Sequence, residues 1–151
     1  MTHEQSKNAE TRCPVCGAGK LKRRVVAERF EYEGDRGTIL VEAKDVPIQV
    51  CDACGETFSG PPAAQIRHDA ICRALKLLTP EEIKSLRERL GKTQQEFAEL
   101  TGIGEATISR WERGRLLQNR ANDNFLRLIA GNPGNLKLLQ DLRVEVNQVP
   151  I

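Results

Sequence analysis

The chain has 151 residues, of which 39% are hydrophobic and 29% charged, and its formal net charge is +2. This composition is typical of water-soluble folded proteins and allows one ordinary domain or two small ones. No segment is apolar enough for a signal peptide or a membrane-spanning helix, so we expect a cytoplasmic protein with no membrane partner. Because the net charge is small, any affinity for nucleic acid must come from local basic patches.

The cysteines indicate a metal site. Four of the five form two matching pairs, in the segments CPVCG and CDACG. A Cys-x-x-Cys turn places two thiolates on one side of a tight loop, and two such turns complete a closed tetrahedral shell for zinc, with no open position for water. We therefore predict one structural Zn²⁺ per chain, with the ligands Cys13, Cys16, Cys51 and Cys54.

Three other uses of these cysteines stay open. A redox-active pair is disfavoured, because two pairs followed by the same glycine indicate one joint site. Iron takes the same four ligands, so the sequence does not distinguish zinc from iron. Zinc-assisted contact with nucleic acid would use a basic run that also fits a solvated strand edge: Lys20, Lys22, Arg23 and Arg24.

Residues 13–60 are predicted to form a small β-rich zinc-binding domain after a disordered amino terminus at 1–12. Leu21 to Tyr32 and Thr38 to Val41 are rich in β-formers and flank a Gly-Asp-Arg-Gly turn signal, which predicts a hairpin. Ile48 to Val50 is expected as a third strand leading into the second cysteine pair. A domain of this size buries little apolar surface, so zinc would contribute much of its folding free energy.

Apolar residues at helical spacing predict a linking helix from Ala63 to Leu78, within a connecting segment 61–78 that is continuous up to Thr79-Pro80. Cys72 lies in this apolar pattern and is expected to be a small buried side chain, with a redox-sensing thiol as the alternative. The domain boundary is predicted near residue 79.

Residues 79–143 are predicted to form an all-α domain of five helices, which gives the chain an α+β fold class. The first helix spans 80–90 and begins with a capping box of Thr79 and Glu82. Further helices are expected at Gln94 to Thr101, after Gly104, and at 121–130 and 135–143. The closing residues 144–151 alternate like a strand but also fit a frayed tail.

Two short helices around a Gly-Ile-Gly turn, in the segment Thr93 to Gly114, are typical of a DNA-binding helix-turn-helix. Thr93 and Glu96 form a second capping box, and Gly102 suits the left-handed conformation that ends many helices. Ile103 can pack on Ile108, which would fix the direction in which the second helix leaves the turn.

The exposed face of that second helix lies opposite Ile108. An arginine at its centre can donate two hydrogen bonds to O6 and N7 of guanine, so Arg110 is the first candidate for base reading, although an ordinary solvated face is the alternative. Trp111 and Glu112 are predicted to be structural. The candidate DNA-contacting residues are Thr93, Gln94, Ala106, Thr107, Ser109, Arg110, Arg113, Arg115, Asn119 and Arg120.

The segment TQQEFA to SRWERG resembles the Xre/Cro-type helix-turn-helix, and this resemblance implies that Gln94 approaches a phosphate or a base edge. Gly104 and Ala106 depart from that pattern, where a Ser/Thr cap and a polar reader are common. The chain as a whole resembles the MqsA-type antitoxins, which join a YgiT-type zinc finger to an Xre-type domain. The residues that carry this resemblance are the helix-turn-helix segment, CPVCG, CDACGE and the Val-Pro-Ile that leads into the second cysteine pair.

That resemblance implies a dimeric repressor that binds palindromic double-stranded operator DNA, autoregulates its operon, and neutralises a partner toxin through its zinc domain. The alternative is a stand-alone Xre-type regulator with a metal- or redox-responsive zinc domain. A zinc-dependent enzyme is disfavoured because four thiolates leave no open metal position, and no catalytic residue is predicted. Several apolar residues either form a dimer interface or complete the helical core: Leu126, Ile129, Leu136, Leu139 and Leu142.

Overall fold

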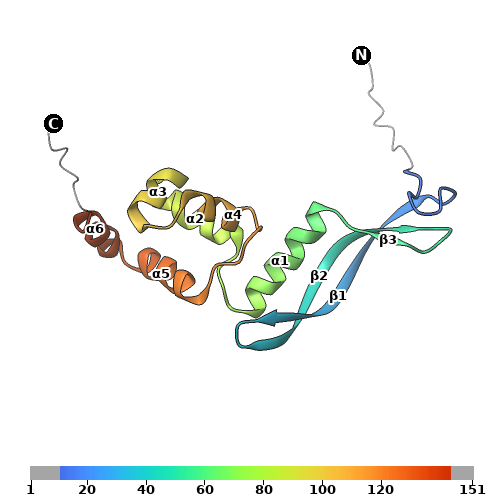
Figure 1. Cartoon of the computed structure of the whole chain (residues 1–151), viewed down its shortest axis with the longest axis horizontal. Helices are drawn as coiled ribbons and strands as arrows, with labels where there is room; N and C mark the ends of the chain where they lie inside the picture. Colours follow the sequence, from blue (N-terminus) through green and yellow to red (C-terminus); the bar gives the residue numbers. More distant parts are fainter. Residues whose placement is uncertain (1–10, 144–151) are drawn as a thin grey trace, which may run out of the picture. The chain divides into compact units, whose positions relative to one another are not determined.

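The computed structural model describes residues 11–143, and the chain divides into two compact units, Met1–Ala70 and Ile71–Ile151 (Figure 1). The first unit is built on an antiparallel sheet and the second is helical, which confirms the predicted α+β class. Of the disordered amino terminus predicted at 1–12, residues 1–10 lie outside the described residues, whereas Arg12 forms a β-bridge with Lys20. The tail predicted at 144–151 also lies outside the described residues. Within residues 11–143, the helices are all too short or too polar to cross a bilayer.

The sheet consists of a long hairpin and a short third strand. Strands β1 (Leu21–Gly34) and β2 (Gly37–Cys51) pair antiparallel, and β3 (Thr57–Phe58) pairs with the end of β2. The predicted hairpin is confirmed, but the separate strand expected at Ile48 to Val50 is wrong, because those residues are the end of β2. Asp45 takes a positive φ of 57° beside an irregularity in the strand register, and this bulge lets one strand continue past a point where a break was expected.

Helix α1 (Pro61–Ala74) ends four residues before the predicted Leu78. Lys76 adopts a left-handed conformation with φ 55°, and the Leu77 amide donates to the carbonyl oxygen of Cys72 at 2.8 Å, which is a left-handed helix end of the kind that glycine usually forms. The predicted continuous helix up to Thr79-Pro80 is therefore wrong. The Cys72 side chain is fully buried, as expected.

The helical unit contains α2 (Pro80–Arg89), α3 (Gln94–Thr101), α4 (Glu105–Glu112), α5 (Arg120–Gly131) and α6 (Pro133–Asp141). Both predicted capping boxes are present, at the starts of α2 and α3. Apolar side chains from four of these helices form one core, which fixes α3 and α4 against α2 and α5. Its buried members are Ile83, Leu86, Phe97, Ile108, Trp111 and Leu126.

A bidentate ion pair joins α2 to the end of α4. The Arg87 guanidinium donates to both carboxylate oxygens of Glu112, at 2.6 and 3.0 Å, and to the carbonyl oxygen of Lys92 at 2.7 Å. Both side chains are 10% exposed or less, and the carboxylate raises the pKa of Arg87. Glu112 is structural, as predicted, because its bidentate ion pair with Arg87 holds the end of α4 against α2.

A second buried carboxylate ties the segment before α2 to α5. Asp123 is fully buried and accepts hydrogen bonds from the Leu78 amide at 2.7 Å, from Gln118 at 3.1 Å and from Arg127 at 2.8 Å. Burial opposes its ionisation, but these three donors outweigh burial and lower the pKa of Asp123. The carbonyl oxygens freed at the end of α1 are also bound from α5, since Arg120 and Arg127 donate to that of Lys76.

Replacing Glu112 by alanine should destabilise the helical unit by about 3 to 5 kcal/mol, because Arg87 is left buried without its counter-ion. Urea unfolding followed by the fluorescence of Trp111, the single tryptophan of the chain, measures this. Glu99→Ala is the control, since its ion pair with Arg143 is half exposed and should contribute below about 1 kcal/mol. Equal losses in the two variants would contradict the structural role of Glu112.

Asp123→Asn should destabilise the helical unit by about 1 to 3 kcal/mol at neutral pH, because a buried acceptor and its charge are lost. The folded-state pKa lies below the unfolded value of about 3.9, so the stabilisation is present above the unfolded value and is lost as the pH falls from there through the lower folded-state pKa. The free energy of unfolding, measured from pH 3 to 7, should depend less steeply on pH in this variant than in the parent protein. The control Asp141→Asn, at an exposed carboxylate, should keep the pH dependence of the parent.

Candidate metal centre and nucleic-acid interface

The four predicted ligands lie together. The Sγ atoms of Cys13 and Cys54 are 3.7 Å apart, as are those of Cys16 and Cys51, and all four lie within 4.8 Å of one another. A tetrahedron with zinc–sulfur bonds of about 2.3 Å has edges of roughly 3.8 Å, so the two separations of 3.7 Å match the edges of a tetrahedral zinc site. The first pair precedes β1 and the second lies at the end of β2, where Leu21 is paired with Cys51.

Backbone amides point at the cysteine sulfurs, as expected for bound thiolates. Gly19 donates to Cys16 at 3.3 Å and Ala53 to Cys51 at 3.4 Å; the Gly19 amide, followed by that of Ala18, lowers the pKa of Cys16 to about 6. At Cys54 the Glu56 amide acts in the same direction, but burial and the neighbouring sulfurs outweigh it and raise the pKa to about 12. Four crowded thiols that cannot all ionise without a cation are the expected donor set of a metal centre.

Gly19 was missed by the sequence analysis. A Cβ at this position would collide with the Cys51 sulfur and would lie 2.8 Å from the Cβ of Ala53, so only glycine lets the two cysteine loops approach. Asp52 joins the same loops, since its carboxylate accepts from the Lys20 amide at 2.8 Å. The sequence does show a glycine three residues after the first cysteine pair. That glycine alone does not indicate that a second loop packs against it, because the second loop is far away in the sequence.

The turn between α3 and α4 has the predicted form. Gly102 has φ 76°, and Gly104 precedes α4 with no side-chain cap. Ile103 packs against the core that contains the buried Ile108, so the direction of α4 is fixed. Trp111 is also buried, which confirms its structural role.

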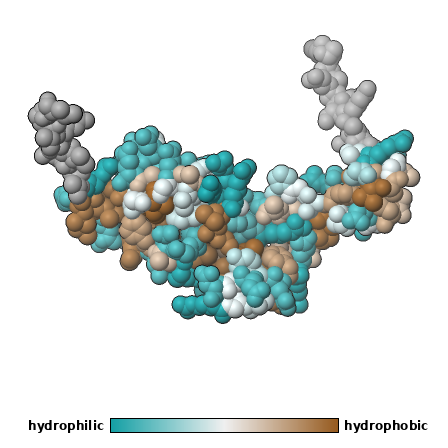
Figure 2. All heavy atoms as spheres, in the orientation of Figure 1, coloured by the Kyte–Doolittle hydropathy of each residue, from teal (hydrophilic) through white to brown (hydrophobic). Residues whose placement is uncertain are grey.

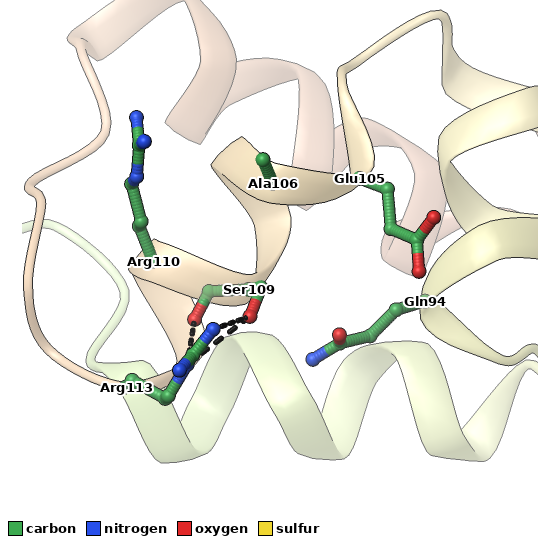
Figure 3. A pocket seen from close by; sticks show the side chains of 6 residues that line it. All are labelled: Gln94, Glu105, Ala106, Ser109, Arg110 and Arg113. Atoms are coloured by element: carbon green, nitrogen blue, oxygen red, sulfur yellow. Dashed lines mark hydrogen bonds between the residues drawn. The ribbon is translucent and has the colours of Figure 1, made fainter.

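Five of the ten predicted DNA-contacting residues surround one hollow of about 390 Å³ (Figure 3). Arg110 extends away from the others, whereas Arg113 folds back and donates from Nε to the Ser109 hydroxyl at 3.1 Å. Gln94 donates to Glu112 at 2.8 Å, which anchors its amide at the edge of the hollow. The residues shared with the prediction are Gln94, Ala106, Ser109, Arg110 and Arg113.

The other five predicted residues lie outside this hollow. Thr93 caps α3 and Asn119 caps α5 with a hydrogen bond to the Asn122 amide at 2.8 Å. Arg120 donates to backbone carbonyls at the end of α1. Thr107 is half buried and Arg115 is exposed. DNA contact by all ten residues stays a prediction, and Glu105, which also borders the hollow, was not among them.

Gly19→Ala should weaken metal binding, because the added methyl group pushes the two cysteine loops apart. Competition with a chromogenic chelator should show at least about a tenfold loss of zinc affinity, by analogy with changes to groups that position ligands. Gly60→Ala is the matched control, since its Cβ would meet its nearest neighbour at an ordinary 3.8 Å. Unchanged affinity in Gly19→Ala would contradict this account of the metal centre.

The chain matches, over residues 11–143, the family model described as the antitoxin component of bacterial toxin-antitoxin systems, MqsA. It is 27% identical over 137 residues to Antitoxin MqsA of Escherichia coli K12, an alignment that covers 87% of this chain and 99% of that protein. It is also 31% identical over 65 residues to Antitoxin HigA-2 of Vibrio cholerae, covering 43% of this chain and 62% of that protein.

The match includes both cysteine pairs and all six helices of the described residues. A cluster of four cysteines with this spacing, in a chain of this family, supports one structural zinc ion per chain, as predicted. The chain therefore belongs to the MqsA family of antitoxins.

Proposed function

We propose that this antitoxin is a cytoplasmic, sequence-specific repressor that binds the operator of its own operon as a dimer and neutralises a partner toxin through its zinc-binding unit. The observation that carries the proposal is the exposed face of α4, where Arg110 extends into solvent beside a hollow at the start of α3. In helix-turn-helix proteins the second helix lies in the major groove, where its exposed side chains face the base edges. Arg110 lies in the last turn of α4.

Arg110 has the properties of a base reader. It is exposed, and no carboxylate within residues 11–143 pairs with its guanidinium. The ordered partner of Arg113 is the neutral Ser109, so its charge is also available to a phosphate. A guanidinium that is held by no counter-ion can donate two hydrogen bonds to guanine without first breaking an ion pair.

The hydrogen bonds of Glu112, at the end of α4, support the proposal that the exposed face of α4 is held rigidly for docking on DNA. The Glu112 carboxylate binds Arg87 of α2 and Gln94 of α3, so α2, α3 and α4 are joined at one side chain. Preorganisation of this kind reduces the entropy lost when a protein binds DNA.

Zinc, when bound, supplies structural cross-linking of the two cysteine loops. Four thiolates complete its shell, so the proposed role of this unit is to bind a protein and not to catalyse a reaction. The hairpin offers apolar side chains to a partner, since Val25 and Leu40 are 61% and 62% exposed. The antitoxin relatives support a toxin as that partner.

Exposed leucines support dimerisation. Of the apolar residues considered for an interface, Leu126 and Ile129 are buried in the helical unit, while Leu142 is exposed. Leu128 of α5 and Leu138 of α6 are exposed as well, and Figure 2 shows hydrophobic atoms over these two helices. Burying this surface against a second copy would place two α4 helices on one palindromic operator.

The proposal is tested by binding of the full chain to its own upstream DNA at a stated salt concentration, alone and with the product of the adjacent gene. Tight binding that the product modulates is the expected result. Tight binding that the product leaves unchanged would favour a stand-alone regulator, and absence of binding would overturn the DNA-binding role.

Arg110→Ala should weaken binding to the upstream DNA by about 1 to 3 kcal/mol and relax one base preference, because the guanidinium contacts to guanine are lost. Fluorescence anisotropy with labelled operator and with scrambled DNA measures both effects. Arg36→Ala, in the exposed hairpin turn of the other unit, is a control that removes the same charge. Equal affinities for the two variants would remove Arg110 from the reading role.

Leu138→Lys should raise the dimer dissociation constant, because a charge would be buried at the proposed interface. Sedimentation velocity across a range of protein concentrations measures the shift. Leu40→Lys, at a similarly exposed leucine on the hairpin, should leave the oligomeric state unchanged. If both variants remain dimeric at the concentrations where the parent protein is dimeric, another surface forms the dimer.

A further inference from the structure

The glutamates of α3 and α4 differ in whether their carboxylates have a partner. Glu96 caps α3 by accepting from the Thr93 amide at 2.9 Å, Glu99 pairs with Arg143, and Glu112 binds Arg87. Within residues 11–143, Glu105 has neither a cation nor a hydrogen-bond donor as a partner. It is the first residue of α4 and it is exposed. Its charge therefore contributes little to the fold beyond a favourable interaction with the helix dipole.

Glu105 borders the hollow that we assign to base reading. Figure 3 places its carboxylate on the Gln94 side of the hollow and the Arg110 guanidinium on the opposite side, with the small Ala106 between them. The first residues of such a helix are those that reach base edges in the major groove. Ala106 is too short to make polar contacts with a base, and Thr107 is half buried and lies outside the hollow. Glu105 is therefore the exposed polar side chain of the first turn of α4 that borders the hollow.

A carboxylate so close to DNA is unfavourable unless it meets a donor. Phosphates repel it, and guanine and thymine present acceptors in the major groove, so neither would bind it. Cytosine presents its N4 amino group alone, whereas adenine presents an amino group beside the N7 acceptor. The two arginines that border the same hollow, Arg110 and Arg113, leave its lining with a net positive charge, which permits one carboxylate near the backbone.

We propose that Glu105 is a specificity-determining residue that accepts a hydrogen bond from the N4 amino group of a cytosine in the operator. This inference rests on the proposed DNA-binding function and adds to it a base identity. The operator half-site then contains a cytosine read by Glu105, at a different base pair from the guanine read by Arg110. Because two opposite charges face different bases, a half-site that exchanges these bases is rejected at both positions.

Selection of bound sequences from a random duplex library, with the full zinc-loaded chain, tests this proposal. Four proteins are compared: the parent, Glu105→Gln, Glu105→Ala and Glu99→Gln. The parent should enrich a motif with a strongly preferred cytosine. Glu105→Gln should shift that one position toward adenine, because an amide both donates to N7 and accepts from N6. Glu105→Ala should lose the preference there by at least about fivefold, while the other positions stay the same.

Glu99→Gln is the matched control, since Glu99 is a half-exposed glutamate of α3 outside the hollow, and it should keep the parent motif. Thermal unfolding followed by Trp111 fluorescence checks that every variant is folded. A parent motif that both Glu105 variants also select would overturn the role of Glu105 and leave DNA binding intact. A parent protein that enriches no sequence would overturn the proposed function and this inference with it.

Discussion

The ion pair between Arg87 and Glu112 is the contact on which the geometry of the helical unit depends. Its two charges are almost completely buried, so each is stable only while the other is in place. The same carboxylate also accepts from Gln94, which brings the start of α3 and the end of α4 to one point. Hydrophobic packing around Trp111 and Ile108 holds α4 in the core, but this polar contact fixes the rotation and position at which its outer face meets solvent.

The zinc-binding unit depends in a similar way on one contact, the cross-link that a metal ion makes between its two cysteine loops. Its two cysteine loops are far apart in sequence, and the paired strands β1 and β2 bring them together. The sheet buries few large side chains, among them Val41 and Val46, so the metal cross-link is a large part of what holds the loops. A closed shell of this kind gives the metal a structural role, because four thiolates leave no open coordination position.

Local signals in the sequence predicted most of the elements, because their causes lie within a few residues of one another. Thr93 with Glu96, Gly102 in a left-handed conformation and each of the two Cys-x-x-Cys pairs are of this kind. The long-range features could not be predicted in this way. Nothing near Lys76 indicates that α1 ends there, since the arginines that bind its carbonyl oxygen come from α5. Likewise the need for glycine at Gly19 depends on a sulfur 32 residues later in the chain.

The proposed function requires the claim that the outer face of α4 contacts DNA. Hydrogen–deuterium exchange of the full chain, with and without its upstream DNA, tests this claim directly. We predict slower exchange, on DNA binding, in peptides that cover the start of α3 and residues 104–113, with little change in the hairpin. Slower exchange confined to the basic start of β1, at residues 20–24, would contradict the claim and assign nucleic-acid binding to the zinc-binding unit.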